Sequence, residues 1–239
     1  MNIRNHVIIL DDIPCDVMQK KIKHVHLRVH TPYGQVKISA PLRMNLETIR
    51  LFGISKLDWI RKQQIKIKIQ KREAPREYVD GESHYYLGQK YLLQVLEQGS
   101  VSSSMVILKH DAIELCVRKG TSKIRRAEIL QNWYRQQLRE LVSSYIVNLE
   151  KKMGVKVFEI RFKTMKTRWG TCNIRAKRIW LNTELAKKSI EHIEYVLIHE
   201  MVHLLERHHN EKFKAYMTKF SPNWKHLRKE LNRFAIGGR

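Results

Sequence analysis

The chain has 239 residues, enough for one large domain or two small ones. Hydrophobic residues make up 43% and charged residues 29%, a balance that excludes an intrinsically disordered chain. No apolar run approaches the ~18 residues that a membrane helix needs, and the N-terminus lacks the pattern of a signal peptide. Three widely spaced cysteines form no CxxC pair, so we expect a cytoplasmic protein without membrane contact.

The formal net charge of +23 is unevenly distributed. Residues 1–120 carry 20 Lys and Arg against 12 Asp and Glu, whereas residues 121–239 carry 26 against 11, a surplus of 15 cations. Such a surplus attracts polyanions. Nucleic acid is therefore a candidate partner of the basic C-terminal half, and an ordinary solvated basic surface is the alternative.

The first 120 residues are predicted to be β-rich with a helical insert. Residues 23–29 and 36–38 alternate polar and apolar around Pro32-Tyr33-Gly34, which predicts a hairpin ending at Pro41. Residues 45–73 have helical spacing, with Asn45 as the cap and Gly53 as a break, although their end, QIKIKIQKR, also fits a strand. Residues 78–118 return to strands, with turns at Gly88 and at 110–111 and a loop at 100–104.

The second half is predicted to mix helices with short strands. Thr121 or Ser122 caps a long helix that runs to Met153, and Gly154 ends it. Further elements are expected as strands at 155–162, 167–173 and 178–181, a short helix from Asn182 or Thr183, and helices at 190–206, 210–220 and 222–233. The fold class is therefore α+β, with domains at 1–120 and 121–239 and a boundary near Gly120.

Five residues of the second half form an HExxH motif, His199-Glu200-Met201-Val202-His203. Helix positions four apart are separated by about 40° around the axis, so both imidazoles face one side. Two nitrogens at this spacing can bind one tetrahedral zinc ion, and Glu200 lies beside the open position as a general base. The flanking apolar residues indicate a buried helix, in which unpaired His and Glu side chains are costly. The motif thus predicts one catalytic zinc ion (Zn2+), with two solvated histidines as the alternative.

A catalytic zinc ion needs a third protein ligand and one open site. His209 lies ten residues after His199, and on a continuing helix it would lie about 280° around the axis. The chain must therefore leave the helix after about Arg207 if His209 is a ligand. The competing candidates for this third position are His208, Glu211 and Glu230, while His192 and His226 are expected at the surface or between helices.

A second motif, Thr167-Arg168-Trp169-Gly170-Thr171-Cys172, precedes the metal-binding helix. Its composition predicts a strand, in which Gly170 permits a close approach of the backbone. Such a strand could line a cleft and pair with an extended peptide. Simple core packing explains the motif equally well.

Taken in order, these motifs resemble those of the YgjP-like metallopeptidases, a family related to the SprT and WLM zinc peptidases. The resemblance rests on residues 168–172 (RWGTC), 179–182 (IWLN) and 195–204 (YVLIHEMVHL), followed by His209 and Phe213. It covers most of 121–239, and the hairpin ending Ser39-Ala40-Pro41 extends it toward the N-terminus. Thr171 and Met201 stand where the family commonly has Ser and Leu.

The resemblance implies a zinc-dependent peptidase. It implies zinc on His199, His203 and His209, Glu200 as the general base, and a zincin-like catalytic domain that hydrolyses protein or peptide substrates. Because some relatives in the broader SprT group act on proteins attached to DNA, action on or near DNA is a further expectation.

Two other functions are compatible with the residues alone. One is a nucleic-acid-binding accessory protein with a structural or vestigial zinc site, which the basic second half motivates. The other is a metal-dependent hydrolase of a different amide, because HExxH identifies the catalyst and not its substrate.

Overall fold

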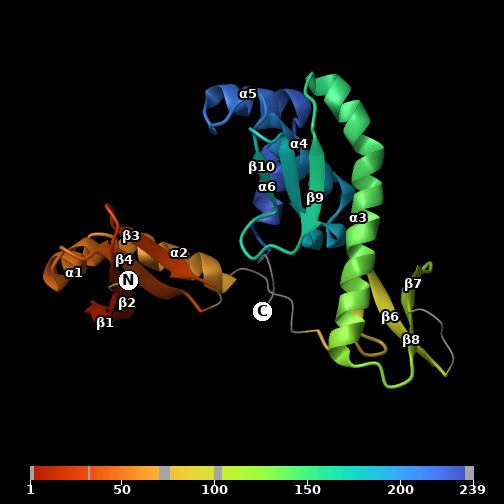
Figure 1. Cartoon of the computed structure of the whole chain (residues 1–239), viewed down its shortest axis with the longest axis horizontal. Helices are drawn as coiled ribbons and strands as arrows, with labels where there is room; N and C mark the ends of the chain where they lie inside the picture. Colours follow the sequence, from red (N-terminus) through yellow and green to blue (C-terminus); the bar gives the residue numbers. More distant parts are fainter. Residues whose placement is uncertain (1–2, 32, 70–75, 100–103, 235–239) are drawn as a thin grey trace. The chain divides into compact units, whose positions relative to one another are not determined.

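The computed structural model describes residues 3–31, 33–69, 76–99 and 104–234. The chain divides into two compact units, Met1–Arg72 and Glu73–Gly238, each with its own hydrophobic core. Each unit is described by itself below, and Figure 1 labels the elements of both.

The N-terminal unit is a four-stranded sheet with two helices packed against one face. Its strands are β1 (Arg4–Leu10), β2 (Ile13–Lys20), β3 (His26–His30) and β4 (Gln35–Pro41), in the order β1-β2-β4-β3. The central pair β2 and β4 is parallel, and the other pairs are antiparallel. The predicted hairpin is confirmed as β3 and β4, but β1 and β2 were not predicted.

Two helices follow the sheet, α1 (Leu46–Ile54) and α2 (Leu57–Ile69). Asn45 caps α1 as predicted, since its side-chain oxygen accepts from the Thr48 N–H at 2.7 Å. Ile49 and Ile60 are completely buried against the sheet. The strand alternative for QIKIKIQKR is wrong for residues 64–69, because α2 continues to Ile69.

The C-terminal unit begins with a second mixed sheet. It contains β5 (Ser83–Tyr86), β6 (Gln89–Gln98), β7 (Met105–Leu108) and β8 (Ala112–Arg118), in the order β5-β6-β8-β7. The predicted turns are confirmed, because β5 pairs antiparallel with β6 and β7 with β8. Of the predicted loop at 100–104, residues 100–103 lie outside the described part of the chain.

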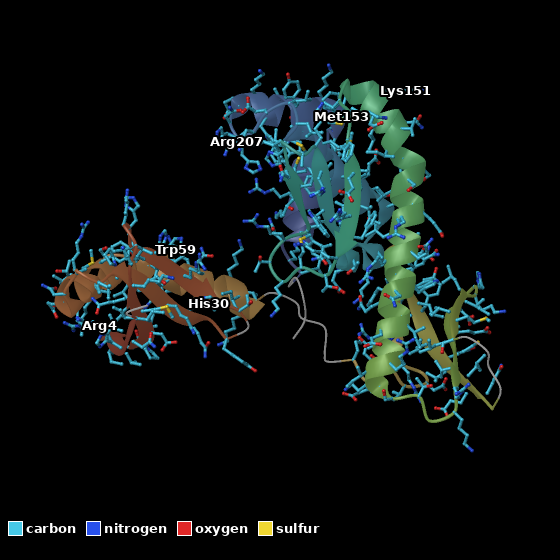
Figure 2. All side chains as sticks on the ribbon, viewed as in Figure 1. Arg4, His30, Trp59, Lys151, Met153 and Arg207 are labelled. Carbon is cyan, nitrogen blue, oxygen red and sulfur yellow. The ribbon has the colours of Figure 1, made fainter. Side chains whose placement is uncertain are left out.

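One long helix, α3 (Lys123–Met153), runs the length of this unit (Figure 1). Ser122 caps it by accepting from the Arg125 N–H, and Gly154 ends it in the left-handed conformation at φ 68°, as predicted. Figure 2 labels Lys151 and Met153 in its last turn, where Lys151 is exposed and Met153 is buried in the core. The helix therefore contributes an apolar stripe to a core shared by both ends of the unit.

Beside the C-terminal half of α3 lies a three-stranded sheet with the remaining helices (Figure 1). Its strands are β9 (Glu159–Lys163), β10 (Gly170–Asn173) and β11 (Arg178–Asn182), in the order β10-β11-β9, followed by a 3-10 helix (Thr183–Lys187), α4 (Ile190–Val202), α5 (Glu211–Phe220) and α6 (Trp224–Leu231). Strand β10 is antiparallel to β11, and β11 is parallel to β9. The predicted α+β class is confirmed in this mixture of helices and mixed sheets.

The division between the units differs from the boundary expected near Gly120. Leu93 and Leu115 of the second sheet belong to the same core as α3 and α4. The hydroxyl of Tyr134 on α3 also donates to the Tyr85 carbonyl at 2.9 Å. Residues 83–118 therefore pack with the C-terminal unit, and the chain divides at Arg72.

Among the described residues, no helix is long and apolar enough to cross a membrane.

Candidate metal centre

The HExxH motif lies at the C-terminal end of α4. The helix is apolar along most of its length, and Val196, Leu197 and Met201 are buried in the core. His199 and Glu200 occupy its last turn, and His203 is the residue that follows, still with helical angles (φ −63°, ψ −18°). The two imidazoles lie together as predicted, with ring centroids 5.1 Å apart.

The chain turns immediately after the helix and returns His209 to the same place. The Glu206 N–H donates to the Val202 carbonyl at 2.9 Å, and Asn210 then caps α5 by accepting from the Phe213 N–H at 3.0 Å. The helix thus ends at Val202, earlier than the expected departure near Arg207. His209 Nε2 lies 3.1 Å from His199 Nε2, which places both nitrogens within reach of one ion.

The three histidines form a cluster suited to a metal ion. One nitrogen from each of His199, His203 and His209 lies within 4.8 Å of the others, and no other such group of three His, Cys, Asp or Glu occurs in the described ranges. His199 and His203 are half-buried, and His209 is exposed. The cluster is therefore open on the side of His209.

The competing third residues have other roles in the structure. His208 is exposed, and its backbone N–H donates to the Glu206 side chain at 3.1 Å. Glu211 pairs with Lys214. Glu230 pairs with both His192 and His226, at 3.3 Å from each, so these two histidines pack between or beside helices as expected.

The surroundings keep the three imidazoles neutral. Burial, together with the neighbouring His203 and His209, lowers the pKa of His199 to about 3. Burial also lowers the pKa values of His203 and His209. Each ring therefore has one unprotonated nitrogen near neutral pH, which is the form that binds a metal ion.

The donor set fits a tetrahedral zinc ion. Two ligands of a tetrahedral ion at Zn–N distances of about 2.0–2.1 Å lie roughly 3.3 Å apart, close to the 3.1 Å between His209 and His199. His203 Nδ1 lies 3.3 Å from the Glu206 carbonyl, which fixes this nitrogen as the protonated one and leaves Nε2 for the metal. Three imidazoles leave a fourth position for water or substrate.

Glu200 has an unusually confined side chain. It is 6% exposed, and burial raises its pKa to about 8, although Arg168 lowers it. A Cβ at Gly170, the first residue of β10, would lie 2.7 Å from both Cγ and Oε1 of Glu200. The second sequence motif therefore contacts the Glu200 side chain through Gly170, and so it does more than fill the core.

Phe213 is a residue of the site that the reasoning from spacing missed. Its ring is buried in α5 and contacts all three imidazoles, with centroid distances of 5.0, 4.9 and 4.5 Å to His199, His203 and His209. The sequence resemblance included Phe213, but nothing in its spacing showed this contact. It supports the three rings from one side.

The chain was compared with curated proteins, solved structures and protein families. No curated protein matches the chain. Among solved structures, it is similar to the metallopeptidase zymogen abylysin of Pyrococcus abyssi, at 19% identity over 39% of this chain and 90% of that one, with a TM-score of 0.35. The zymogen jannalysin of Methanocaldococcus jannaschii gives 17% identity over 39% and 92% of the chains, with a TM-score of 0.33. The YgjP-like metallopeptidase domain model matches residues 23–234, and the chain therefore belongs to the YgjP-like metallopeptidase family.

Proposed function

We propose that this protein is a zinc-dependent peptidase in which His199, His203 and His209 hold one zinc ion and Glu200 is the general base. The observation that carries the proposal is the approach of three neutral imidazole nitrogens to within 4.8 Å of one another. The family and the neutral donor set both support it.

A bound zinc ion supplies Lewis acidity, which polarises a peptide carbonyl and makes water acidic enough to deprotonate near neutral pH. The chain's own residues supply binding and proton transfer. The Glu200 carboxylate takes a proton from the attacking water and passes it to the leaving nitrogen. The burial of Glu200 excludes bulk water from this transfer.

An extended peptide is the substrate that the neighbouring sheet favours. Strand β10 is an edge of the three-stranded sheet and pairs with β11 on one side only. Its first residue contacts Glu200. A peptide added along the free edge of β10 would pass beside the metal ligands, with main-chain hydrogen bonds setting its register.

The test combines metal analysis with cleavage of an unfolded protein substrate. Wild type is expected to hold one zinc ion, and His203→Ala to lose it. Glu200→Gln is expected to keep the zinc but to cleave about 10²–10⁴-fold more slowly, because only the base is removed. A Glu200→Gln enzyme as active as wild type would contradict the mechanism, and cleavage of small amides but not peptides would indicate a different amide hydrolase.

We also propose nucleic acid as a second partner, on the face of the three-stranded sheet that points away from α4. Strand register places Thr171, Trp180 and Arg161 side by side on this face. Arg161 and Lys163 lie over the Trp180 ring, at 5.4 and 4.3 Å from its centroid. Cations beside an aromatic ring suit phosphates and stacked bases.

This second candidate predicts salt-dependent binding of single-stranded DNA. The logarithm of the binding constant should fall linearly with the logarithm of salt concentration, and Lys163→Ala should reduce the size of that slope by about 0.7. Binding without salt dependence would remove the argument. Binding accompanied by zinc uptake but no cleavage of any peptide would favour the accessory protein with a structural or vestigial zinc site.

We place the protein in the cytoplasm. The described cysteines, Cys15, Cys116 and Cys172, are all free thiols, which is typical of a reducing compartment. Fractionation of cells that express the intact protein tests this location.

A further inference from the structure

Gly170 lies so close to the Glu200 side chain that there is no room for a Cβ atom at position 170. The ideal Cβ position at Gly170 lies 2.7 Å from both Cγ and Oε1 of Glu200, a distance that real Cβ contacts essentially never show, and 3.0 Å from Cδ. Gly170 is not among the glycines with positive φ, so its backbone conformation is open to any residue. Glycine is needed here because the Glu200 side chain occupies the space of a Cβ.

This contact is the principal restraint on the Glu200 carboxylate. In the described part of the chain the carboxylate accepts no hydrogen bond, and the nearby charge that acts on it is Arg168. A buried side chain without hydrogen bonds is placed by packing alone. The backbone of β10 is therefore the surface against which Glu200 rests.

The chain leading to Gly170 is itself held by one buried side chain. Asn182 is completely buried, and its Nδ2 donates to the carbonyls of Met165 and Arg168, each at 2.9 Å. Its backbone N–H donates to the Trp169 carbonyl at 2.8 Å. Three bonds from Asn182 thus fix the segment immediately before Gly170, and this gives a physical reason for both the RWGTC and IWLN segments.

We propose that Gly170 is a positioning residue for Glu200: its missing side chain leaves the space that the Glu200 side chain occupies next to the metal-binding turn. The steric part stands independently, while its consequence for catalysis rests on the proposed peptidase function. Binding of zinc itself should not depend on Gly170, because the three atoms nearest to its ideal Cβ position all belong to Glu200.

The first arm of the test is a double-mutant cycle on the stability of the metal-free, full-length protein. Gly170→Ala should lower the Tm by about 3–10 °C when Glu200 is present, because the added methyl displaces a buried side chain. In the Glu200→Ala background the same change should cost little, since the colliding atoms are gone. Equal penalties in both backgrounds would overturn the proposal.

The second arm measures catalysis and metal content in the same variants. Gly170→Ala should keep its zinc and its KM but lose kcat about 10–100-fold, because a displacement of the base near 1 Å has an effect of this size. Gly99→Ala is the matched control, since its φ is not positive and a Cβ there would meet no atom within 4 Å. A Gly170→Ala enzyme with wild-type kcat, or a Gly99→Ala enzyme with the same kcat loss, would overturn the proposal.

The two arms separate the proposal from the function on which it rests. If the protein cleaves no peptide, the proposed function fails, yet the stability cycle still measures whether Gly170 and Glu200 compete for space. If peptides are cleaved but the cycle is additive, the function stands and the positioning role is refuted.

Discussion

Replacing Glu200 by Gln should stabilise the protein when no metal is bound, although it removes the proposed base. The carboxyl group is 6% exposed, and burial raises its pKa from 4.5 to about 8. Folding at neutral pH therefore requires either desolvation of a carboxylate or uptake of a proton. Glutamine has the same shape and no charge, so the variant avoids this cost.

The magnitude follows from the difference in pKa between the unfolded and folded states. A carboxyl group with a raised folded pKa contributes fully below pH 4.5, and its contribution is lost as pH rises to about 8. At pH 7 the loss corresponds to roughly 2.5 pKa units, or about 3 kcal/mol, and above pH 8 it approaches about 5 kcal/mol. The advantage of Glu200→Gln should follow this curve.

The assay is urea unfolding of the chelator-treated, full-length protein between about pH 7 and pH 9, a range in which an unfolded histidine is largely neutral. Tryptophan fluorescence reports mainly on the C-terminal unit, because four of the five tryptophans lie in it and only Trp59 lies in the N-terminal unit. Glu194→Gln, on the same helix but half-buried, is the control. An advantage that stays constant with pH would show that Glu200 is not desolvated and would refute the reasoning.

Three further outcomes test the metal centre and the core around it. His203→Ala should lose most of its zinc on dialysis, measured by atomic absorption, because two ligands remain. Phe213→Ala should cost about 3–5 kcal/mol in urea unfolding and weaken zinc binding about 10–100-fold in a competition titration, because its ring supports all three imidazoles. Burial alone would raise the pKa of Glu150, but the hydrogen bond from Lys156 lowers this pKa overall. Glu150→Gln should therefore reduce the free energy of unfolding by about 1–2 kcal/mol at pH 7. Unfolding titrations should show this loss becoming progressively smaller as pH falls below 4.5, where the carboxylate of the wild type becomes protonated.

Elements with strong local signals were predictable from the sequence. The Asn45 cap, the Ser122 cap and the Gly154 end of α3 agree with the structure because capping depends on residues within one turn. Strand β1 was missed because Val7 and Ile9, on its outer face, are 69% and 52% exposed and hide the alternation. The parallel pairing of β2 with β4 joins segments that no local pattern connects.

The division of the chain depends on packing that the sequence does not display. A boundary near Gly120 follows from a change in composition, but a core is defined by contacts between distant segments. Leu115 of β8 and Leu138 of α3 are completely buried in one cluster, so the second sheet belongs with the long helix. The sequence pattern predicts the secondary structure of each segment, but it does not predict which other segment packs against its apolar face.

The candidate site shows the same contrast. The spacing of His199 and His203 places both on one face of a helix, since helix geometry alone decides it. Whether His208 or His209 joins the other two histidines depends on a turn of irregular geometry, so the spacing of the residues could not decide between them. The structure brings His209 to the cluster and leaves His208 exposed.

The structure also divides the proposed chemistry between two parts of the chain. The three proposed metal ligands lie within eleven consecutive residues, from His199 to His209, so one helix end and one turn are sufficient to assemble the cluster. The place of Glu200 is set by Gly170, thirty residues earlier and on a different element. Metal binding and carboxylate placement can therefore fail separately, because a change in β10 moves the base without disturbing a ligand. A family of variants at 170 and 182 should consequently lose turnover while keeping zinc, whereas variants of the three histidines lose both.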